Sequence, residues 1–202
     1  MSSYVEKRQS ARRGLLAIFP VAIAIIVVLA LSLGLRYAWK HYQRAAFPLG
    51  YQEYVFRYSA RNGLHPALVF AVIRCESSFD PLAVSEAYAR GLMQITEDTF
   101  EWARWRMGDD ENRSFDEMFI PEVNIRYGTF ILRLHFDHFG GVRETLAAYH
   151  AGRGSVQGWL ADDRFSHDGV TLYTTPFRRT NAYIYNVLAA KNTYLALYDF
   201  SG

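Results

Sequence analysis

The chain has 202 residues, of which 50% are hydrophobic and 21% charged. This composition excludes a disordered tail, and the length excludes a large multidomain protein and fits one packed domain with a smaller appendage. The net charge of +2 combines +6 in residues 1–47 (seven Lys or Arg, one acid) with −4 in residues 48–202 (15 bases, 19 acids), so we expect no nucleic-acid partner for the main domain.

Residues 15–35 form a run without a single charge. At about 1.5 Å per residue, a helix of this length spans a hydrocarbon core of about 30 Å. A cleaved signal peptide is the alternative, but its apolar region would run for only about 7–15 residues and end in small residues, whereas Arg36, Tyr37 and Trp39 follow here. The sequence therefore predicts a basic cytoplasmic N-terminus (1–14), one transmembrane helix (15–35) and a stalk (36–47). Charge slightly favours this orientation.

Residues 48–202 repeat their apolar side chains at helical rather than strand-like spacing, which predicts one all-α domain after the break at residues 47–50. Pro66 and Pro121 suit the first turns of helices, Thr96 is a candidate N-cap, and Gly140 is a candidate helix stop. The expected helices cover residues 51–62, 66–76, 97 onward, 121–139, 142–149 and 180–198, and a loop is expected over 77–87.

Glu76 is the first candidate for catalysis. It closes an apolar helical run over residues 67–73, and a carboxyl held against such a surface loses solvation, which raises its pKa toward that of a working general acid. The alternative is a solvated surface glutamate or one paired with Arg74, as most acidic side chains are exposed.

Other chemistry-bearing residues carry weaker signals. Cys75, the single cysteine, lies in the same apolar helix without a neighbouring histidine, which predicts a buried small side chain rather than a nucleophile. His135 and His138 stand three residues apart, but no third ligand is near them in the sequence. No phosphate-cradling or metal-binding motif occurs, so we expect no metal and no cofactor.

Four ordered motifs carry a family resemblance. They are residues 76–85 (ESSFDPLAVS), 91–95 (GLMQI), 124–128 (NIRYG) and 147–152 (AAYHAG). Together they closely resemble the motifs of soluble-lytic-transglycosylase-type catalytic domains, and the membrane-anchored bacterial members are the most similar. The match covers about residues 48–200.

The resemblance implies a goose-type lysozyme-like helical fold. It also implies cleavage of the β-1,4 bond between N-acetylmuramic acid and N-acetylglucosamine in peptidoglycan, with a 1,6-anhydromuramic acid product. Glu76 matches the catalytic glutamate, first an acid and then a base. The implied substrate-binding residues are Ser85, Gln94, Tyr149, His150 and Tyr183. The implied location is the bacterial cytoplasmic membrane, with the domain on the outer side facing the glycan strands.

The chain departs from the family pattern at four places. Tyr88 stands where a glycine is common, Thr96-Glu97 replaces Met-Pro, His150 replaces an asparagine, and Arg179 replaces a carboxylate.

Two rival functions stay open. A hydrolase on the same fold would need a second carboxylate, for which Asp80, Glu86 and Asp98 are the nearest candidates in sequence. A non-catalytic glycan-binding scaffold is the other rival.

Overall fold

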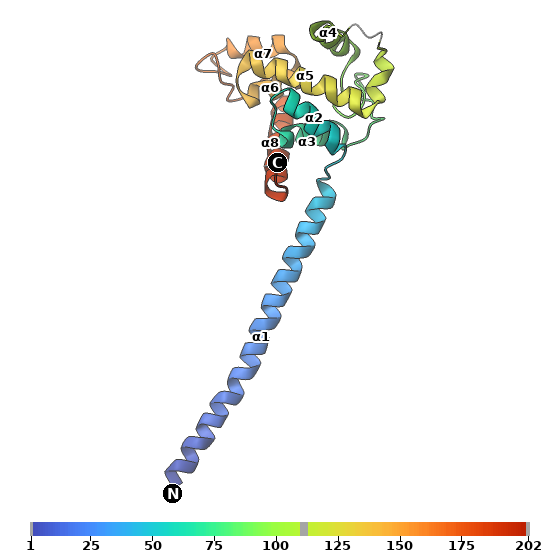
Figure 1. The fold of residues 1–202 in the computed structure, drawn as a ribbon. Coiled ribbons are helices and arrows are strands. Elements are labelled where there is room, and N and C mark those ends of the chain that lie inside the picture. The colour runs from blue at the N-terminus through green and yellow to red at the C-terminus, as the bar shows by residue number, and fades with distance from the viewer. Residues whose placement is uncertain (1, 110–112, 201–202) are drawn as a thin grey trace. The chain divides into compact units, whose positions relative to one another are not determined.

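The computed structural model describes the backbone of residues 2–109 and 113–200 (Figure 1). Every regular element of these residues is helical, which confirms the predicted all-α class. The chain divides into two compact units, Met1–Pro48 and Leu49–Gly202. The helices are α1 (Ser2–Ala46), α2 (Gln52–Arg61), α3 (Pro66–Ser77), α4 (Glu97–Met107), the 3-10 helix η1 (Phe115–Phe119), α5 (Pro121–Phe139), α6 (Val142–Ala151), α7 (Arg153–Leu160) and α8 (Arg178–Leu197).

The first unit is the single long helix α1. Its stretch Ala22–Ala46 is long and apolar enough to cross a membrane, by length and composition. The large apolar side chains described in this helix, from Phe19 to Leu35, are all exposed. Helical backbone continues to Ala46, so the segment expected to be a stalk is itself helical.

In the second unit, local chemistry sets the limits of α3 and α5. Pro66 and Pro121 occupy first turns, where their missing N–H costs nothing. The His65 ring caps α3 by accepting a hydrogen bond from the Ala67 N–H at 3.2 Å. Gly140 ends α5 with φ 73°, a left-handed conformation that glycine adopts without penalty. The six helices expected in this unit are all present, with ends shifted by at most a few residues.

Two elements were not expected from the sequence. The 3-10 helix η1 begins with a capping box in which Ser114 and Glu117 satisfy each other's backbone N–H groups. Helix α7 contains Gly154 and Gly158, which are poor helix formers and mask its pattern. Both elements are short, so their apolar residues complete too few turns to show a period.

Helix α3 forms the centre of the core. All side chains of its residues 67–73 are buried, and it packs most extensively against α8. The rings of Phe70 and Tyr194 lie 5.5 Å apart across this interface. Because α8 lies along α3, residues more than 100 positions apart in sequence meet near the C-terminal end of α3.

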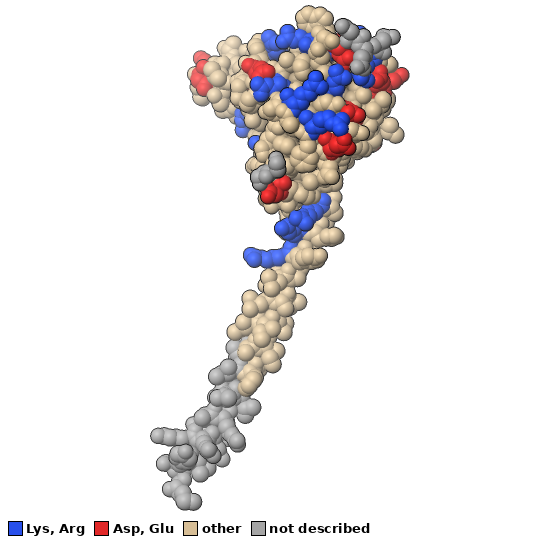
Figure 2. Space-filling model, viewed as in Figure 1, with Lys and Arg blue, Asp and Glu red and all other residues tan. Residues whose placement is uncertain are grey.

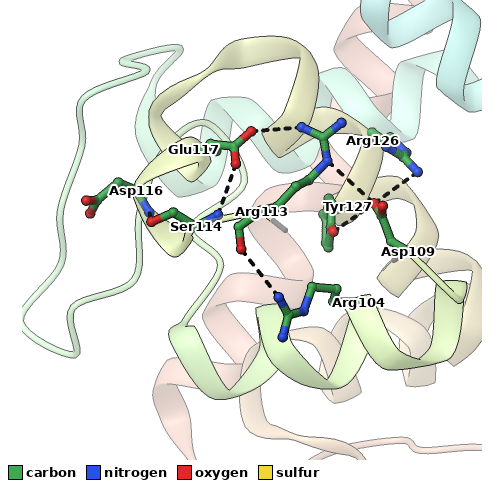
Figure 3. A network of polar contacts seen from close by, with 8 residues as sticks. All are labelled: Arg104, Asp109, Arg113, Ser114, Asp116, Glu117, Arg126 and Tyr127. Carbon is green, nitrogen blue, oxygen red and sulfur yellow. Dashed lines mark hydrogen bonds and ion pairs between the residues drawn. The ribbon is translucent and has the colours of Figure 1, made fainter. Parts of the chain in front are cut away.

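An ion-pair network around the buried side chain of Asp109 joins the segment that follows α4 to α5 (Figure 3). The Asp109 side chain, 3% exposed, accepts a hydrogen bond from the Tyr127 hydroxyl at 3.0 Å and pairs with Arg126 at 3.0 Å. Arg113 lies 3.6 Å from the same carboxylate and pairs with Glu117 at 2.8 Å. A buried carboxylate is tolerated only with such partners, so this network fixes the start of α5 relative to the end of α4.

Charges of both signs share the molecular surface. Figure 2 shows Lys and Arg side chains gathered across one face of the helical unit, with Asp and Glu side chains at their edges. Ion pairs such as Arg57–Glu122 and Arg90–Asp116 account for part of this mixture. Exposed pairs of this kind contribute only about 0–1 kcal/mol each, so the packed core is the main source of stability.

Candidate active site

A cleft of about 770 Å³ opens on the helical unit. Its walls come from the end of α3, the loop over residues 85–96, and helices α4, α5 and α6. Five of the six site residues expected from the sequence line it: Glu76, Ser85, Gln94, Tyr149 and His150. The sixth, Tyr183, is 9% exposed and is not among the lining residues.

Glu76 occupies the last turn of α3 and faces the cleft. Loss of solvation around its carboxyl raises its pKa from 4.5 to about 7. The Tyr183 hydroxyl opposes this shift because it stabilises the carboxylate form. At neutral pH the group is therefore balanced between a proton donor and a proton acceptor.

Two tyrosines stand close to Glu76. The Tyr149 hydroxyl, from α6, donates a hydrogen bond to the Met93 carbonyl oxygen at 2.7 Å. The Tyr183 hydroxyl, from α8, is buried, and within the described part of the chain it has no partner that meets full hydrogen-bond geometry, although it interacts with the Glu76 carboxyl. Burial and the Glu76 charge raise the pKa of both phenols well above the usual value, so both stay neutral.

One wall of the cleft is the loop over residues 85–96, which is held in part by its own hydrogen bonds. The Ser85 hydroxyl accepts from the Ala89 N–H at 3.1 Å. The Gln94 side-chain amide donates to the carbonyl oxygens of Ala83 at 3.1 Å and Gly91 at 3.0 Å. These bonds use the NH2 group of the Gln94 side chain as the donor, and its carbonyl oxygen remains an acceptor. Gln94 has φ 48°, so the backbone itself turns sharply here.

The residues that fix this loop lie outside the set expected from the sequence. Asn124, fully buried on α5, accepts from the Met93 N–H at 2.7 Å and donates to the carbonyl oxygens of Met118 at 2.8 Å and Arg90 at 3.0 Å. The Ser77 hydroxyl donates to the Leu92 carbonyl oxygen at 2.9 Å, which joins the loop to the end of α3. Both residues lie in motifs that the sequence analysis identified (76–85 and 124–128). The motifs did not reveal that these side chains hold the loop in place.

His150 adds a titratable ring to the site. It lines the cleft, packs against the Tyr183 ring with 4.7 Å between centroids, and has Nδ1 3.3 Å from the Thr180 hydroxyl oxygen. Partial burial lowers its pKa below 6.5, so the ring is neutral at neutral pH. A neutral imidazole keeps the hydrogen-bonding capacity of the asparagine that it replaces.

Two other departures, Tyr88 and Arg179, are exposed and are not among the residues that line the cleft. Tyr88 is 76% exposed and has φ 58°, a left-handed conformation that suits glycine far better than tyrosine. Arg179 is exposed in the first turn of α8 and does not line the cleft. Of the three acids considered as a second carboxylate, only Asp98 lines the cleft; Asp80 instead accepts from the Leu82 N–H at 2.9 Å.

The prediction for Cys75 was wrong in one respect. The residue is exposed rather than buried, because the buried part of α3 ends at Ile73. Local loss of solvation and the nearby Glu76 carboxylate nevertheless raise the pKa of the thiol to about 11. The thiol is therefore protonated at neutral pH, which agrees with the expectation that it is not a nucleophile.

A helical domain whose central helix ends in a cleft-facing glutamate defines a lysozyme-like class of protein. Residues 53–169 match the family described as the Transglycosylase SLT domain, and the chain belongs to this family. It is 33% identical over 153 residues to the soluble lytic murein transglycosylase of Salmonella typhimurium, which covers 75% of this chain and 24% of that protein.

Two further similarities concern a membrane-bound relative and a solved structure. The membrane-bound lytic murein transglycosylase C of Edwardsiella ictaluri is 34% identical over 128 residues, or 56% of this chain and 34% of that protein. The crystal structure of the 70-kDa soluble lytic transglycosylase from Escherichia coli superposes with a TM-score of 0.68 and 30% identity over 76% of this chain and 25% of that one. The chain thus spans about a quarter of the soluble relatives, and its lysozyme-like fold is confirmed.

Proposed function

We propose that this protein is a peptidoglycan lytic transglycosylase that cleaves the β-1,4 bond between N-acetylmuramic acid and N-acetylglucosamine. The observation that carries the proposal is Glu76, whose carboxyl lies in the cleft with its pKa raised to about 7. Relatives of this chain are named soluble and membrane-bound lytic murein transglycosylases, which supports murein as the substrate class.

One carboxyl serves both steps of the proposed reaction. Protonated Glu76 donates its proton to the glycosidic oxygen, and the bond from that oxygen to C1 of the muramyl residue breaks. The resulting carboxylate then takes the proton from the muramyl 6-hydroxyl, whose oxygen attacks C1 and closes the 1,6-anhydro ring. The proton count balances, and Glu76 ends protonated. A pKa near 7 suits a group that must donate and then accept.

The other site residues have supporting roles in this proposal. Ser85, Gln94 and His150 bind the substrate from the cleft walls. Tyr149 contributes its ring to the wall, since its hydroxyl is engaged with the Met93 carbonyl oxygen. Tyr183, which is buried, acts on the substrate through Glu76 rather than by direct contact. We propose this indirect role for Tyr183 in place of the direct binding role expected from the sequence.

Product analysis tests the reaction. Sacculi digested by the full chain in detergent should release muropeptides lighter by one water than hydrolytic products, because an internal hydroxyl replaces water as the nucleophile. Mass spectrometry separates the two product classes. Reducing-end muramic acid as the main product would indicate a hydrolase instead, with Asp98 as the carboxylate that positions the water. Glycan binding without either product would indicate a scaffold.

The proposed topology places residues 1–14 in the cytoplasm, residues 15–35 across the cytoplasmic membrane, and the stalk (36–47) and catalytic domain outside. The apolar helix described above and the basic residues Lys7, Arg8, Arg12 and Arg13 support it. A reporter enzyme that works only outside the cytoplasm should show activity when it is fused after Tyr42. A reporter that works only in the cytoplasm should show none when it is fused at the same position. The reverse pattern would contradict both the topology and the substrate.

A further inference from the structure

Helix α8 holds the ring of His150 from one side. The Nδ1 atom of this ring lies 3.3 Å from the hydroxyl oxygen of Thr180, and the ring packs against that of Tyr183 with 4.7 Å between centroids. Thr180 and Tyr183 stand three positions apart in α8, which places both on one face of the helix. Thr180 is only 2% exposed, so its hydroxyl has little access to solvent.

The buried hydroxyl determines the direction of this hydrogen bond. A neutral imidazole carries one ring proton, so Nδ1 either accepts from the Thr180 hydroxyl or donates to it. Within residues 2–109 and 113–200, the contact with Nδ1 is the one hydrogen bond described for this hydroxyl. If Nδ1 were the donor, the hydroxyl proton would be buried without an acceptor, which is unfavourable. The hydroxyl therefore donates and Nδ1 accepts.

This direction places the ring proton of His150 on Nε2. The ring is neutral at neutral pH, because partial burial lowers its pKa below 6.5. His150 lines the cleft and its side chain is exposed, so the N–H at Nε2, on the side of the ring away from Thr180, is available to a ligand. An asparagine at this position could offer a donor or an acceptor, whereas this histidine offers a donor.

We propose that Thr180 is a positioning residue that acts through His150. It fixes the neutral ring in the tautomer that carries the proton on Nε2, and the ring then donates a hydrogen bond to an acceptor oxygen of the glycan. The inference rests on the proposed function, because it takes the glycan as the ligand. It adds a role for a buried residue of α8 that does not itself line the cleft.

Nitrogen NMR of the ring tests the tautomer directly. The full chain is prepared in detergent with isotope-labelled histidine and studied at about pH 8, where His150 is neutral. Its signals are identified by their loss in His150→Asn. Nε2 should show the chemical shift of a protonated nitrogen and Nδ1 that of an unprotonated one. Thr180→Val, which keeps the shape of the side chain, should lower the ratio of these tautomers about fivefold, as loss of one net hydrogen bond implies.

Binding shows whether the fixed ring matters to the glycan. Kd values for purified glycan chains are measured by calorimetry with the full chain carrying Glu76→Gln, so that no turnover occurs. His150→Ala should weaken binding about fivefold, since one hydrogen bond is lost. Thr180→Val should weaken it about twofold, because the ring loses its fixed proton and orientation, and Thr180→Ser should restore both the tautomer ratio and the Kd. In a chain that already carries His150→Ala, Thr180→Val should have no further effect.

Thr145→Val is the matched control. Thr145 is a fully buried threonine on α6, the helix that carries His150, and its hydroxyl donates to the Gly141 carbonyl oxygen at 2.7 Å. This variant should lower the thermal stability, as Thr180→Val does, but should change neither the tautomer ratio nor the Kd. The comparison separates a general loss of stability from the loss of the contact with His150.

Three results would contradict the inference. A wild-type His150 ring with its proton mainly on Nδ1 would overturn the assigned tautomer, whether or not any variant folds. An unchanged tautomer ratio in folded Thr180→Val would remove the positioning role. An unchanged Kd in that variant, or an equal effect of Thr180→Val with and without the His150 ring, would overturn the contact with the glycan. The proposed reaction stands or fails separately, on the products released by the unmodified protein.

Discussion

Gly91→Ala should lower the free energy of unfolding by about 3 kcal/mol or more, which combines left-handed strain with overpacking of a rigid site. Gly91 has φ +74°, and a Cβ built on it would lie 2.1 Å from the Met118 carbonyl oxygen and 2.4 Å from Asn124 Nδ2. Both atoms are held, because Nδ2 donates to the carbonyl oxygens of Met118 and Arg90. A methyl group therefore breaks the clamp that fixes the cleft loop.

Gly108→Ala is the matched control for this prediction. Gly108 has φ +61°, but nothing lies within 4 Å of its added Cβ. Gly108→Ala should lower the free energy of unfolding by only about 1 kcal/mol, the cost of placing alanine in a left-handed conformation. Chemical unfolding of the full chain in detergent, followed by circular dichroism, compares the two variants. Equal losses would mean that the loop adapts to the methyl group and that the contact with Met118 and Asn124 carries no special weight.

Residues that start or end helices explain why most helices of the domain could be predicted. Pro66, Pro121 and Gly140 act within their own turns, so their effect on the backbone depends little on the rest of the fold. Helix α7 lacks such signals, since its glycines oppose helix formation and packing against α6 compensates. Tertiary packing of this kind cannot be derived from the spacing of residues in one segment.

The candidate site likewise contains residues that could be predicted from local sequence and residues that could not. Glu76 could be singled out because its desolvation follows from the apolar helix in which it lies. The clamp by Asn124 could not, because its hydrogen bonds reach backbone groups 31 and 34 residues away on the cleft loop. The motif that contains Asn124 is structural in this chain, as its neighbours Arg126 and Tyr127 hold the buried Asp109.

For Tyr183 and Cys75, too, burial depends on tertiary packing that the sequence does not reveal. Tyr183 reaches Glu76 only because α8 packs along α3, and no sequence pattern of α8 reveals that its hydroxyl is buried. Cys75 lies next to Glu76 in sequence, and the apolar run before it suggested burial, but the last turn of α3 extends beyond the core. Whether a position at a helix end faces the core depends on its neighbours in space.

Glu76→Gln should reduce peptidoglycan cleavage by at least about 10²-fold, the lower end of what general acid–base catalysis supplies. The amide keeps the shape of the carboxyl but can neither protonate the glycosidic oxygen nor accept the proton of the 6-hydroxyl. Turnover is measured as the release of soluble muropeptides from sacculi by the full chain. Ser78→Ala, an exposed residue outside the cleft lining, serves as the control and should keep its activity.

The same substitution should stabilise the protein at alkaline pH, which distinguishes lost chemistry from lost folding. The folded pKa of Glu76 is raised to about 7 from 4.5, so between these values the folded state binds more protons than the unfolded state, and wild-type stability falls as pH rises. The Gln variant lacks this dependence.

Wild-type kcat/KM should likewise fall above about pH 7, because Glu76 must be protonated to donate. Tyr183→Phe should move that fall to higher pH, since the Tyr183 hydroxyl lowers the Glu76 pKa. Full activity in a folded Glu76→Gln protein, or a flat profile across pH 7, would remove Glu76 from the reaction.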